Sequence, residues 1–329
     1  MLKGLPLIDL HRHLDGSVRL STILEIAQQH HIPLPAQDVE GLRPYVQITE
    51  KQPGVMAFIE KFHYMMAILV DDAICYRIAY ECVEDLYHEG IDYAELRFSP
   101  WFMAETNQLD ARDVVGAVIQ GVTDGSRKFN LPVGLIGILS RTYGPDIAWK
   151  ELEALKTFRD DLVGLDLAGD EIHFPGDQFV PHFKVARDMG WQITVHAGES
   201  CGPKSIWQAI RELGAQRIGH GIAALEDKPL LDYLREHNIG IECNLTSNVQ
   251  TSSVVDYAVH PLKQFLEENI QATINTDDPG ISAVTLRDEY QKAESLLGLT
   301  PVQIQQVQRN AIHQSFLSEE KKRLLMKLV

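Results

Sequence analysis

Two histidines separated by one residue, His11 and His13, follow a largely apolar run at residues 5–10. Side chains alternate between the two faces of a β-strand, so the two imidazoles point the same way, about 6.6 Å apart along the strand, and Arg12 points to the other face. This spacing allows both rings to reach one metal ion. Taken alone the pair is a weak signal, because two histidines can equally be hydrogen-bonded parts of a core.

Further residues that can bind metals or carry protons lie at or near the ends of later apolar runs. They are His196, Glu199, His220, Asp277 and Asp278. Taken singly, each is explained as a helix cap, a turn residue or a core histidine, and Asp278 before Pro279 is typical of a turn. In a parallel sheet, however, all of them would meet at one edge, which is improbable by chance.

Three imidazoles and one carboxylate suit Zn²⁺, a borderline ion that takes nitrogen and oxygen donors and keeps room for water in a catalytic site. The predicted ligands of one zinc ion per chain are His11, His13, His196 and Asp277. Zinc would activate water at neutral pH. Glu199 is then free to carry protons, and His220 can orient the attacking water or stabilise its charge. The predicted reaction is hydrolytic attack on an unsaturated carbon.

The elements that must position these residues alternate along the chain. Short runs rich in β-branched residues predict strands at residues 5–14, 91–100, 132–140, 162–171, 191–199, 216–222, 239–248 and 271–280. Apolar residues spaced by three and four predict helices at residues 111–129, 149–158, 179–190, 204–214, 229–238 and 260–269. Eight β/α units favour a closed TIM (β/α)8 barrel of the α/β class over an open doubly wound sheet, and no Gly-rich phosphate loop follows the first run.

We expect one hydrolase domain over residues 1–329. The long connection at about residues 17–90 contains helical runs and begins at the C-terminal end of the first strand. Because that end is the active-site face of a barrel, the insertion is either a lid over the mouth or an extra packing layer. The tail from about Leu286 predicts further helices that close the fold.

Charge and composition exclude several classes of partner. The chain has 30 basic and 46 acidic residues and a net charge of -16, which would repel a phosphate backbone. No apolar run approaches the ~20 residues that span a bilayer, and the N-terminus lacks the features of a secretory signal, so we expect a cytoplasmic protein without nucleic-acid or membrane partners. The four cysteines form no CxxC pair, which argues against a disulfide framework or a thiolate zinc site.

The motifs HRHLDGS, DLAGDE, VHAGE, GHGI and NTDDP, together with RFSP and TSNVQT, occur in this order across essentially the whole chain. This set strongly resembles the adenosine deaminase family of metal-dependent amidohydrolases. The resemblance implies zinc-assisted hydrolysis of the 6-amino group of adenosine and 2'-deoxyadenosine, a purine nucleoside substrate, and the products inosine or 2'-deoxyinosine and ammonia. No lysine is obviously placed to bridge two metals, which favours a mononuclear site.

The resemblance also implies roles for individual residues. By this resemblance, the catalytic residues are Glu199, which would protonate the purine at N1, and His220 with Asp278, which would hold the attacking water. The substrate-binding residues would be His13, Asp15 at the ribose, the Gly169 backbone at purine N3 and Asp278 at purine N7. Phe58 and Phe62 would form an apolar wall, although phenylalanines at helical spacing are also typical of a core. Asn244 departs from the family pattern, in which cysteine is expected.

Two other functions remain open from the sequence. A deaminase of another 6-aminopurine, such as adenine or a 5'-modified adenosine, would share the metal and ring motifs. A barrel that binds zinc without catalysis is a different class, but a purely structural metal needs no free carboxylate such as Glu199 beside it.

Overall fold

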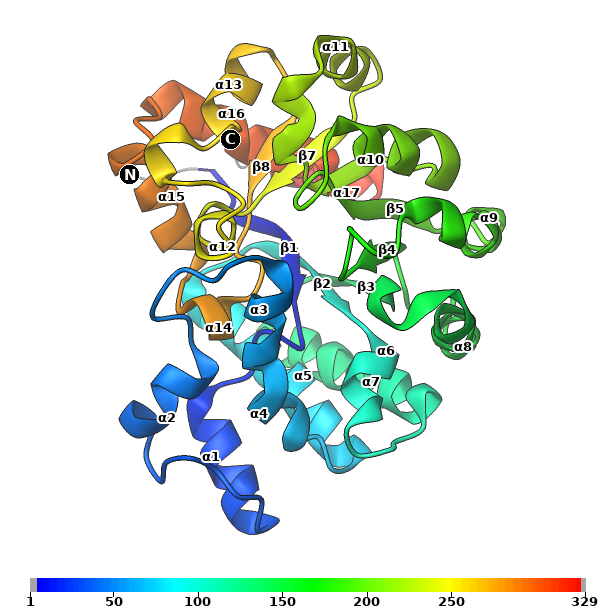
Figure 1. Cartoon of the computed structure of the whole chain (residues 1–329), viewed down its shortest axis with the longest axis vertical. Helices are drawn as coiled ribbons and strands as arrows, with labels where there is room; N and C mark the ends of the chain where they lie inside the picture. The colour runs from blue at the N-terminus through cyan, green and yellow to red at the C-terminus, as the bar shows by residue number, and fades with distance from the viewer. Residues whose placement is uncertain (1–4, 327–329) are drawn as a thin grey trace.

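The computed structural model describes residues 5–326 and confirms the predicted TIM barrel (Figure 1). Its eight strands are parallel and neighbour one another in chain order. They are β1 (Ile8–His13), β2 (Tyr93–Phe98), β3 (Val133–Ser140), β4 (Gly164–Ala168), β5 (Gln192–Ala197), β6 (Arg217–His220), β7 (Gly240–Cys243) and β8 (Ala272–Ile274). The ring closes between the first strand and the segment after β8, where the Asp277 N–H donates to the His11 carbonyl at 2.8 Å.

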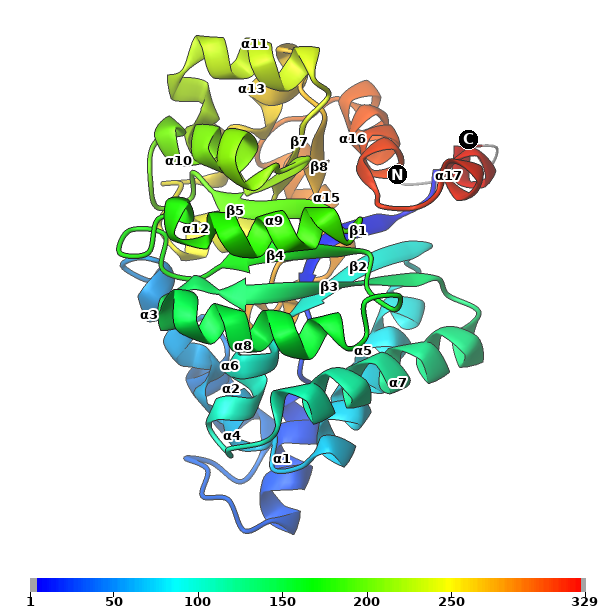
Figure 2. The same ribbon diagram turned by 90° about the vertical axis from the view of Figure 1, so that its right-hand side faces the viewer.

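Helices surround the sheet on its outer side, and in Figure 2 α7, α8 and α9 lie across its face. The helices that connect successive strands are α5 (Asp72–Glu89), α6 (Pro100–Glu105), α7 (Ala111–Phe129), α8 (Gly144–Lys156), α9 (Val180–Asp188), α10 (Pro203–Gln208), α11 (Lys228–Glu236), α12 (Leu245–Gln250) and α13 (Leu262–Glu267). Short helical turns accompany them at η2 (Arg141–Tyr143), η3 (Gly176–Phe179), η4 (Ala209–Leu213), η5 (Ile222–Glu226) and η6 (Tyr257–Val259). The predicted closing helices follow β8 as α14 (Pro279–Ser282), α15 (Leu286–Ser295), α16 (Pro301–Gln314) and α17 (Glu319–Met326).

The boundaries of α7 illustrate why the predicted helices form. The Asp110 side chain accepts a hydrogen bond from the Arg112 N–H at its start, and Asn130 adopts a left-handed φ of 51° at its end. Gly121 on this helix faces α5 so closely that a Cβ atom would lie 2.4 Å from the Tyr76 carbonyl oxygen. The absence of a side chain at Gly121 therefore sets how tightly the two outer helices pack.

The segment at about residues 17–90 has three parts. The helices α1 (Leu20–Gln29) and α2 (Val39–Val46) lie away from the barrel axis in both views (Figures 1 and 2). The helices α3 (Val55–Ile59), η1 (Glu60–Phe62) and α4 (His63–Ala67) come next, and α3 and η1 contribute to the pocket wall. The last helix, α5, packs along α7 as an ordinary barrel helix. Movement of this segment as a lid stays a prediction.

The inside of the barrel holds a layer of ion pairs beneath the strand ends. Arg97 lies 2.8 Å from Asp166 and 2.9 Å from Glu242, and Arg217 lies 2.6 Å from both Glu242 and Glu95. All five side chains are at most 1 % exposed.

Among the helices within residues 5–326, none combines the length and the apolar character needed to cross a membrane.

Candidate metal centre and active site

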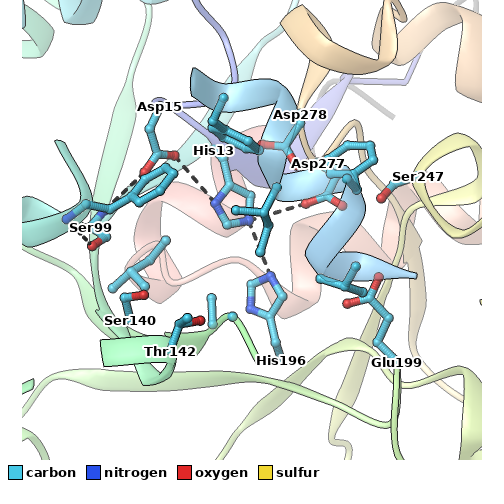
Figure 3. A pocket seen from close by; sticks show the side chains of 18 of the residues that line it. His13, Asp15, Ser99, Ser140, Thr142, His196, Glu199, Ser247, Asp277 and Asp278 are labelled. Atoms are coloured by element: carbon cyan, nitrogen blue, oxygen red, sulfur yellow. Dashed lines mark hydrogen bonds and ion pairs between the residues drawn. The ribbon is translucent and has the colours of Figure 1, made fainter. Parts of the chain in front are cut away.

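A pocket opens at the carboxyl ends of the strands, where the sequence predicted that the titratable residues would meet (Figure 3). Apart from His11, which lies buried beneath it, all the predicted site residues line this pocket. They are His13, Asp15, Gly169, His196, Glu199, His220, Asp277 and Asp278.

The two histidines of β1 point into the barrel, and Arg12 points out of it, as strand alternation predicts. The imidazole centroids of His11 and His13 are 5.4 Å apart, and the Arg12 guanidinium pairs with Glu89 of α5 at 2.9 Å. His11 Nδ1 lies 2.7 Å from the Glu242 carboxylate. Because that carboxylate can only accept, Nδ1 carries the proton and the Nε2 lone pair is left for a metal ion.

His196 is oriented in the same way by a carboxylate from the neighbouring strand. Its Nδ1 lies 2.9 Å from Asp166, so its Nε2 lone pair faces the pocket. That Nε2 atom is 3.3 Å from His13 Nε2 (Figure 3). Burial lowers the pKa of His196 to about 4, which keeps the ring neutral, as ligation requires.

Asp277 completes a buried cluster that can hold a metal ion. One ligand atom from each of His11, His196, His220 and Asp277 lies within 4.8 Å of the others. His13 flanks this group, with Nε2 3.3 Å from the Asp277 carboxylate. All four predicted ligands and the predicted water-orienting histidine are thus brought together.

The donor set of the cluster fits a divalent ion such as zinc. Among the described residues, His11 Nε2 has no hydrogen-bond partner although it is buried, and it lies 3.0 Å from Asp277 Oδ1. Nitrogen lone pairs facing one another and a carboxylate are the donors that Zn²⁺ prefers. The residues present can therefore hold a divalent metal ion.

Glu199, predicted to carry protons, and Asp278, predicted to hold the attacking water, differ from Asp277 in the direction of their pKa shifts. Burial, reinforced by the charge of Asp277, raises the pKa of Glu199 and of Asp278 well above the ordinary range. Burial would also raise the pKa of Asp277, but the His11 and His220 rings outweigh it and hold that pKa well below the usual value. Their surroundings therefore favour the protonated form of Glu199 and Asp278 and the ionised form of Asp277.

His220 is held by a chain of directed hydrogen bonds. Asn248 Nδ2 donates to His220 Nδ1 at 2.9 Å, and His260 Nε2 lies 3.1 Å from Asn248 Oδ1. His220 Nε2 faces Glu199, with the nearest carboxylate oxygen at 3.6 Å. Because Nδ1 accepts from Asn248, the proton of the neutral ring is on Nε2, where it can be donated into the pocket.

Two of the site residues have a strained backbone conformation. His220 and Asp277 adopt left-handed φ angles of 63° and 62°, which non-glycine residues rarely do. Each ends or follows a barrel strand, and this geometry turns its side chain toward the cluster. The surrounding fold offsets the cost of these conformations.

The substrate side of the pocket is lined by Asp15 and Gly169. The Asp15 carboxylate lies 3.7 Å from His13 Nδ1 and accepts from the Ser99 N–H at 3.4 Å. Gly169 has a φ of 110°, and a Cβ atom there would lie 2.4 Å from the Thr142 hydroxyl oxygen. Glycine is therefore required by both conformation and space, which keeps the backbone open to a ligand.

The sequence left open whether Phe58 and Phe62 form a wall of the pocket or part of the core. Both residues line the pocket and both belong to the hydrophobic core.

Asn244 is fully buried, with Nδ2 3.4 Å from His220 Nδ1. Its Oδ1 atom has no hydrogen-bond partner among the described residues.

Sequence reasoning missed the residues that orient the site from behind. These are Asp166, Glu171, Glu242 and Asn248. A usable signal existed for two of them, because Asp166 and Glu242 interrupt otherwise apolar strands. A charge inside a buried strand requires a partner.

Comparison with known proteins places the chain in a family. A model described as adenosine deaminase matches residues 6–329. The chain is 54% identical over 320 residues to an adenosine deaminase of Edwardsiella ictaluri, covering 97% of this chain and 96% of the relative. It is 53% identical over 326 residues to an adenosine deaminase of Klebsiella pneumoniae, covering 99% and 98%.

Solved structures with the same fold extend the comparison. An adenine deaminase from Arthrobacter aurescens matches with a TM-score of 0.91 over 98% of this chain and 97% of that one, but at 24% identity it supports the fold alone. An Arabidopsis N6-mAMP deaminase matches with a TM-score of 0.85 at 28% identity over 99% and 97%. With a family match along nearly its whole length and relatives more than 50% identical, this chain belongs to the adenosine deaminase family.

Proposed function

We propose that this protein catalyses the hydrolytic deamination of adenosine and 2'-deoxyadenosine to inosine and 2'-deoxyinosine, with release of ammonia. The observation that carries the proposal is the position of Glu199, a carboxyl group whose pKa is raised by burial, beside a buried His/Asp cluster. A barrel that binds metal without catalysis has no use for such an acid next to the ion. Relatives named adenosine deaminase at 52–54% identity support the same reaction.

The ion that we propose is Zn²⁺, one per chain, held by His11, His13, His196 and Asp277. When bound, zinc would supply the Lewis acidity that activates water at neutral pH. The orientation of His11 by Glu242 supports this assignment, because it leaves the lone pair of Nε2 facing the cluster. Coordination would also require the neutral form of His13, whose pKa neighbouring carboxylates raise despite burial, so the ion would compete with a proton there.

The chain's own residues then carry the proton transfers. Glu199 would donate its proton to N1 of the purine, which makes C6 more electrophilic. His220 would donate a hydrogen bond from Nε2 to the attacking water, and Asp278 would hold the water and contact N7. Water adds its oxygen to C6, and one of its protons passes to the 6-amino group, whose bond to C6 breaks to release ammonia. The second proton returns to the Glu199 carboxylate as the C6 oxygen becomes a carbonyl, so the acid is restored.

The lining of the pocket favours a nucleoside over its alternatives. The residues that line it include no Lys or Arg among the described part of the chain, so nothing there would neutralise a 5'-phosphate. Asp15, near the mouth, offers a carboxylate for a ribose hydroxyl, a contact that free adenine cannot make. The Gly169 backbone would address N3 of the ring, and His13 would contact the substrate beside the ion.

The proposal is tested by following the loss of absorbance of the 6-amino purine with adenosine, 2'-deoxyadenosine, adenine and AMP, each with and without a chelator. We expect rapid loss with both nucleosides, little with adenine or AMP, and recovery of chelated enzyme on addition of zinc. Metal analysis should find one zinc per chain. Rapid turnover of adenine without turnover of adenosine would reject the nucleoside assignment, and two ions per chain would reject the mononuclear site.

A cytoplasmic location is a further part of this proposal. The four cysteines are free in the structure, and three of them are buried. Free buried thiols are typical of proteins that remain in a reducing compartment.

A further inference from the structure

The DLAGDE motif contains a buried acid that none of the roles above uses. Glu171 lies three residues after the end of β4, and only 6 % of its surface is exposed. Its carboxylate does not face the pocket. It lies behind the loop that follows β5, the loop that carries Glu199.

Glu171 accepts hydrogen bonds from four consecutive backbone N–H groups of that loop. Its Oε1 accepts from Gly198 at 2.6 Å, and its Oε2 accepts from Glu199 at 3.2 Å. The same Oε2 accepts from Ser200 at 2.8 Å and from Cys201 at 3.1 Å. Successive N–H groups that converge in this way form a concave anion site, and here a side chain of the same chain fills it.

Two further contacts hold the loop around this carboxylate. The Ser205 hydroxyl, at the start of α10, donates to Glu171 Oε1. Gly198 turns the chain with a left-handed φ of 72°, and a Cβ atom there would lie 2.5 Å from the Ile206 side chain. The loop therefore packs closely against α10 at Gly198, and the Glu171 carboxylate satisfies its backbone N–H groups in this conformation.

We infer that Glu171 is the positioning residue of the proposed acid Glu199, acting by binding the backbone of its loop rather than by touching substrate. The inference rests on the proposed function, because it assigns a consequence for turnover to this contact. Backbone N–H groups left without an acceptor would let the loop relax, and a displacement of about 1 Å at a reacting group can cost roughly 100-fold in rate.

Glu171→Gln is the decisive variant because it keeps the size of the side chain and removes half of its acceptor capacity. Whichever way the amide turns, its NH₂ group faces at least one of the backbone donors. We expect kcat for adenosine to fall about 100-fold, with KM changed by less than about threefold and the zinc content unchanged. The split between kcat and KM separates loss of the acid from loss of binding.

Glu151→Gln is a matched control at the opposite rim. Glu151 is also buried and accepts from the Ser99 hydroxyl at 2.6 Å, the Trp101 N–H at 3.3 Å and the Ser140 N–H at 2.7 Å. Its amide variant therefore makes the same kind of change to a buried acceptor of backbone N–H groups, but away from the loop that carries Glu199. Burial raises the pKa of Glu151 to about 7, so an amide resembles its protonated form. We expect kcat to stay within about threefold of wild type, and an equal fall of kcat in both variants would overturn the assignment because it would indicate a general loosening of the mouth.

Two measurements test the link between Glu171 and Glu199 directly. Hydrogen exchange of the amides at 198–201 should accelerate in Glu171→Gln and remain unchanged in Glu151→Gln, and this result does not depend on any activity. In the Glu199→Gln background, adding Glu171→Gln should lower kcat by no more than about threefold further, because both changes remove the same function.

The outcomes separate this inference from the proposed function. Wild-type enzyme without adenosine turnover rejects the function, whereas unchanged exchange at 198–201 rejects the contact. Accelerated exchange with near-wild-type kcat overturns the positioning role, as does a full 100-fold loss on top of Glu199→Gln.

Discussion

Two layers of charge lie on top of each other in the barrel and are built differently. In the lower layer, Arg97 and Arg217 lie between Asp166, Glu242 and Glu95 at 2.6–2.9 Å. Each acid contacts an arginine. This layer needs nothing from outside the chain to compensate its buried charges.

The mouth directly above has carboxyl groups and no such cations. Asp15, Glu199, Asp277 and Asp278 line the pocket, and no Lys or Arg lines it within residues 5–326. Buried atoms such as Asp278 Oδ1 have no hydrogen-bond partner in the described part of the chain. A cluster of carboxylates without neighbouring cations attracts a metal ion. Where no cation compensates a carboxyl group, its neighbours' negative charge and its burial raise its pKa and favour the protonated form.

The two layers meet at the histidines. Glu242 contacts Arg97 and His11, and Asp166 contacts Arg97 and His196. The ion pairs of the lower layer thus fix the orientation of the His11 and His196 rings, and these rings face the acidic residues of the mouth. The difference teaches that charge placed for stability is paired within the chain, whereas charge placed for chemistry is left for a ligand to complete.

The largest expected effect is in the mouth. Glu199→Gln should lower kcat for adenosine by about 10³-fold or more, because a proton donor is lost, while zinc content and the melting temperature stay near wild type. Steady-state kinetics with metal analysis check this, and Glu236→Gln at the exposed end of α11 serves as a surface control. A variant of Glu199 close to the wild-type rate would remove the proton-carrier role.

A substitution in the lower layer should mainly lower the free energy of unfolding. Arg97→Met leaves Asp166 and Glu242 without their shared arginine, and breaking a buried ion pair costs about 3–5 kcal/mol. Urea unfolding measures this loss, and zinc affinity should fall with it because both carboxylates orient ligands. A loss below about 1 kcal/mol would contradict the idea that this layer is a structural base.

A matched change in the mouth should leave stability almost untouched. Burial and the charge of Asp277 raise the pKa of Asp278, and an amide has nearly the same shape as the protonated acid that these surroundings favour. Asp278→Asn should therefore change the free energy of unfolding by less than about 1 kcal/mol while lowering kcat about 100-fold. A destabilisation as large as that of Arg97→Met would mean that Asp278 is ionised and paired.

The smallest effect concerns pH. Burial lowers the pKa of His260 to about 3, so between pH 6.5 and 3 the unfolded chain takes up a proton at this position that the folded protein does not. This residue therefore reduces stability as the pH falls, by about 2 kcal/mol at pH 5. His260→Gln should be less stable than wild type at pH 7 but lose less on acidification, as unfolding at both pH values would measure; an equal pH dependence in the two proteins would place the titration elsewhere.

The arrangement of strands and most of the site could be predicted from the chain alone because both depend on local regularities. Alternation along β1 places His11 and His13 on one face, and parallel strands bring His196 and Asp277 to the same edge. The helix at Ala111–Phe129 matched its predicted limits because its caps are encoded beside it. In the long segment at residues 17–90, by contrast, no local pattern distinguished the barrel helix α5 from the added helices.

The sequence by itself determined the barrel, the inward face of β1 and the residues at the strand ends, since period and strand polarity suffice for these. Tertiary structure alone decided which acids stand behind them: Glu242 meets His11 across 231 residues of chain, and Glu171 meets the Glu199 loop across 28. Such contacts depend on the register between strands and on turns such as that at Gly198. A buried carboxylate is stable only when its partner is buried beside it, and a short stretch of sequence does not show which distant residue that partner is.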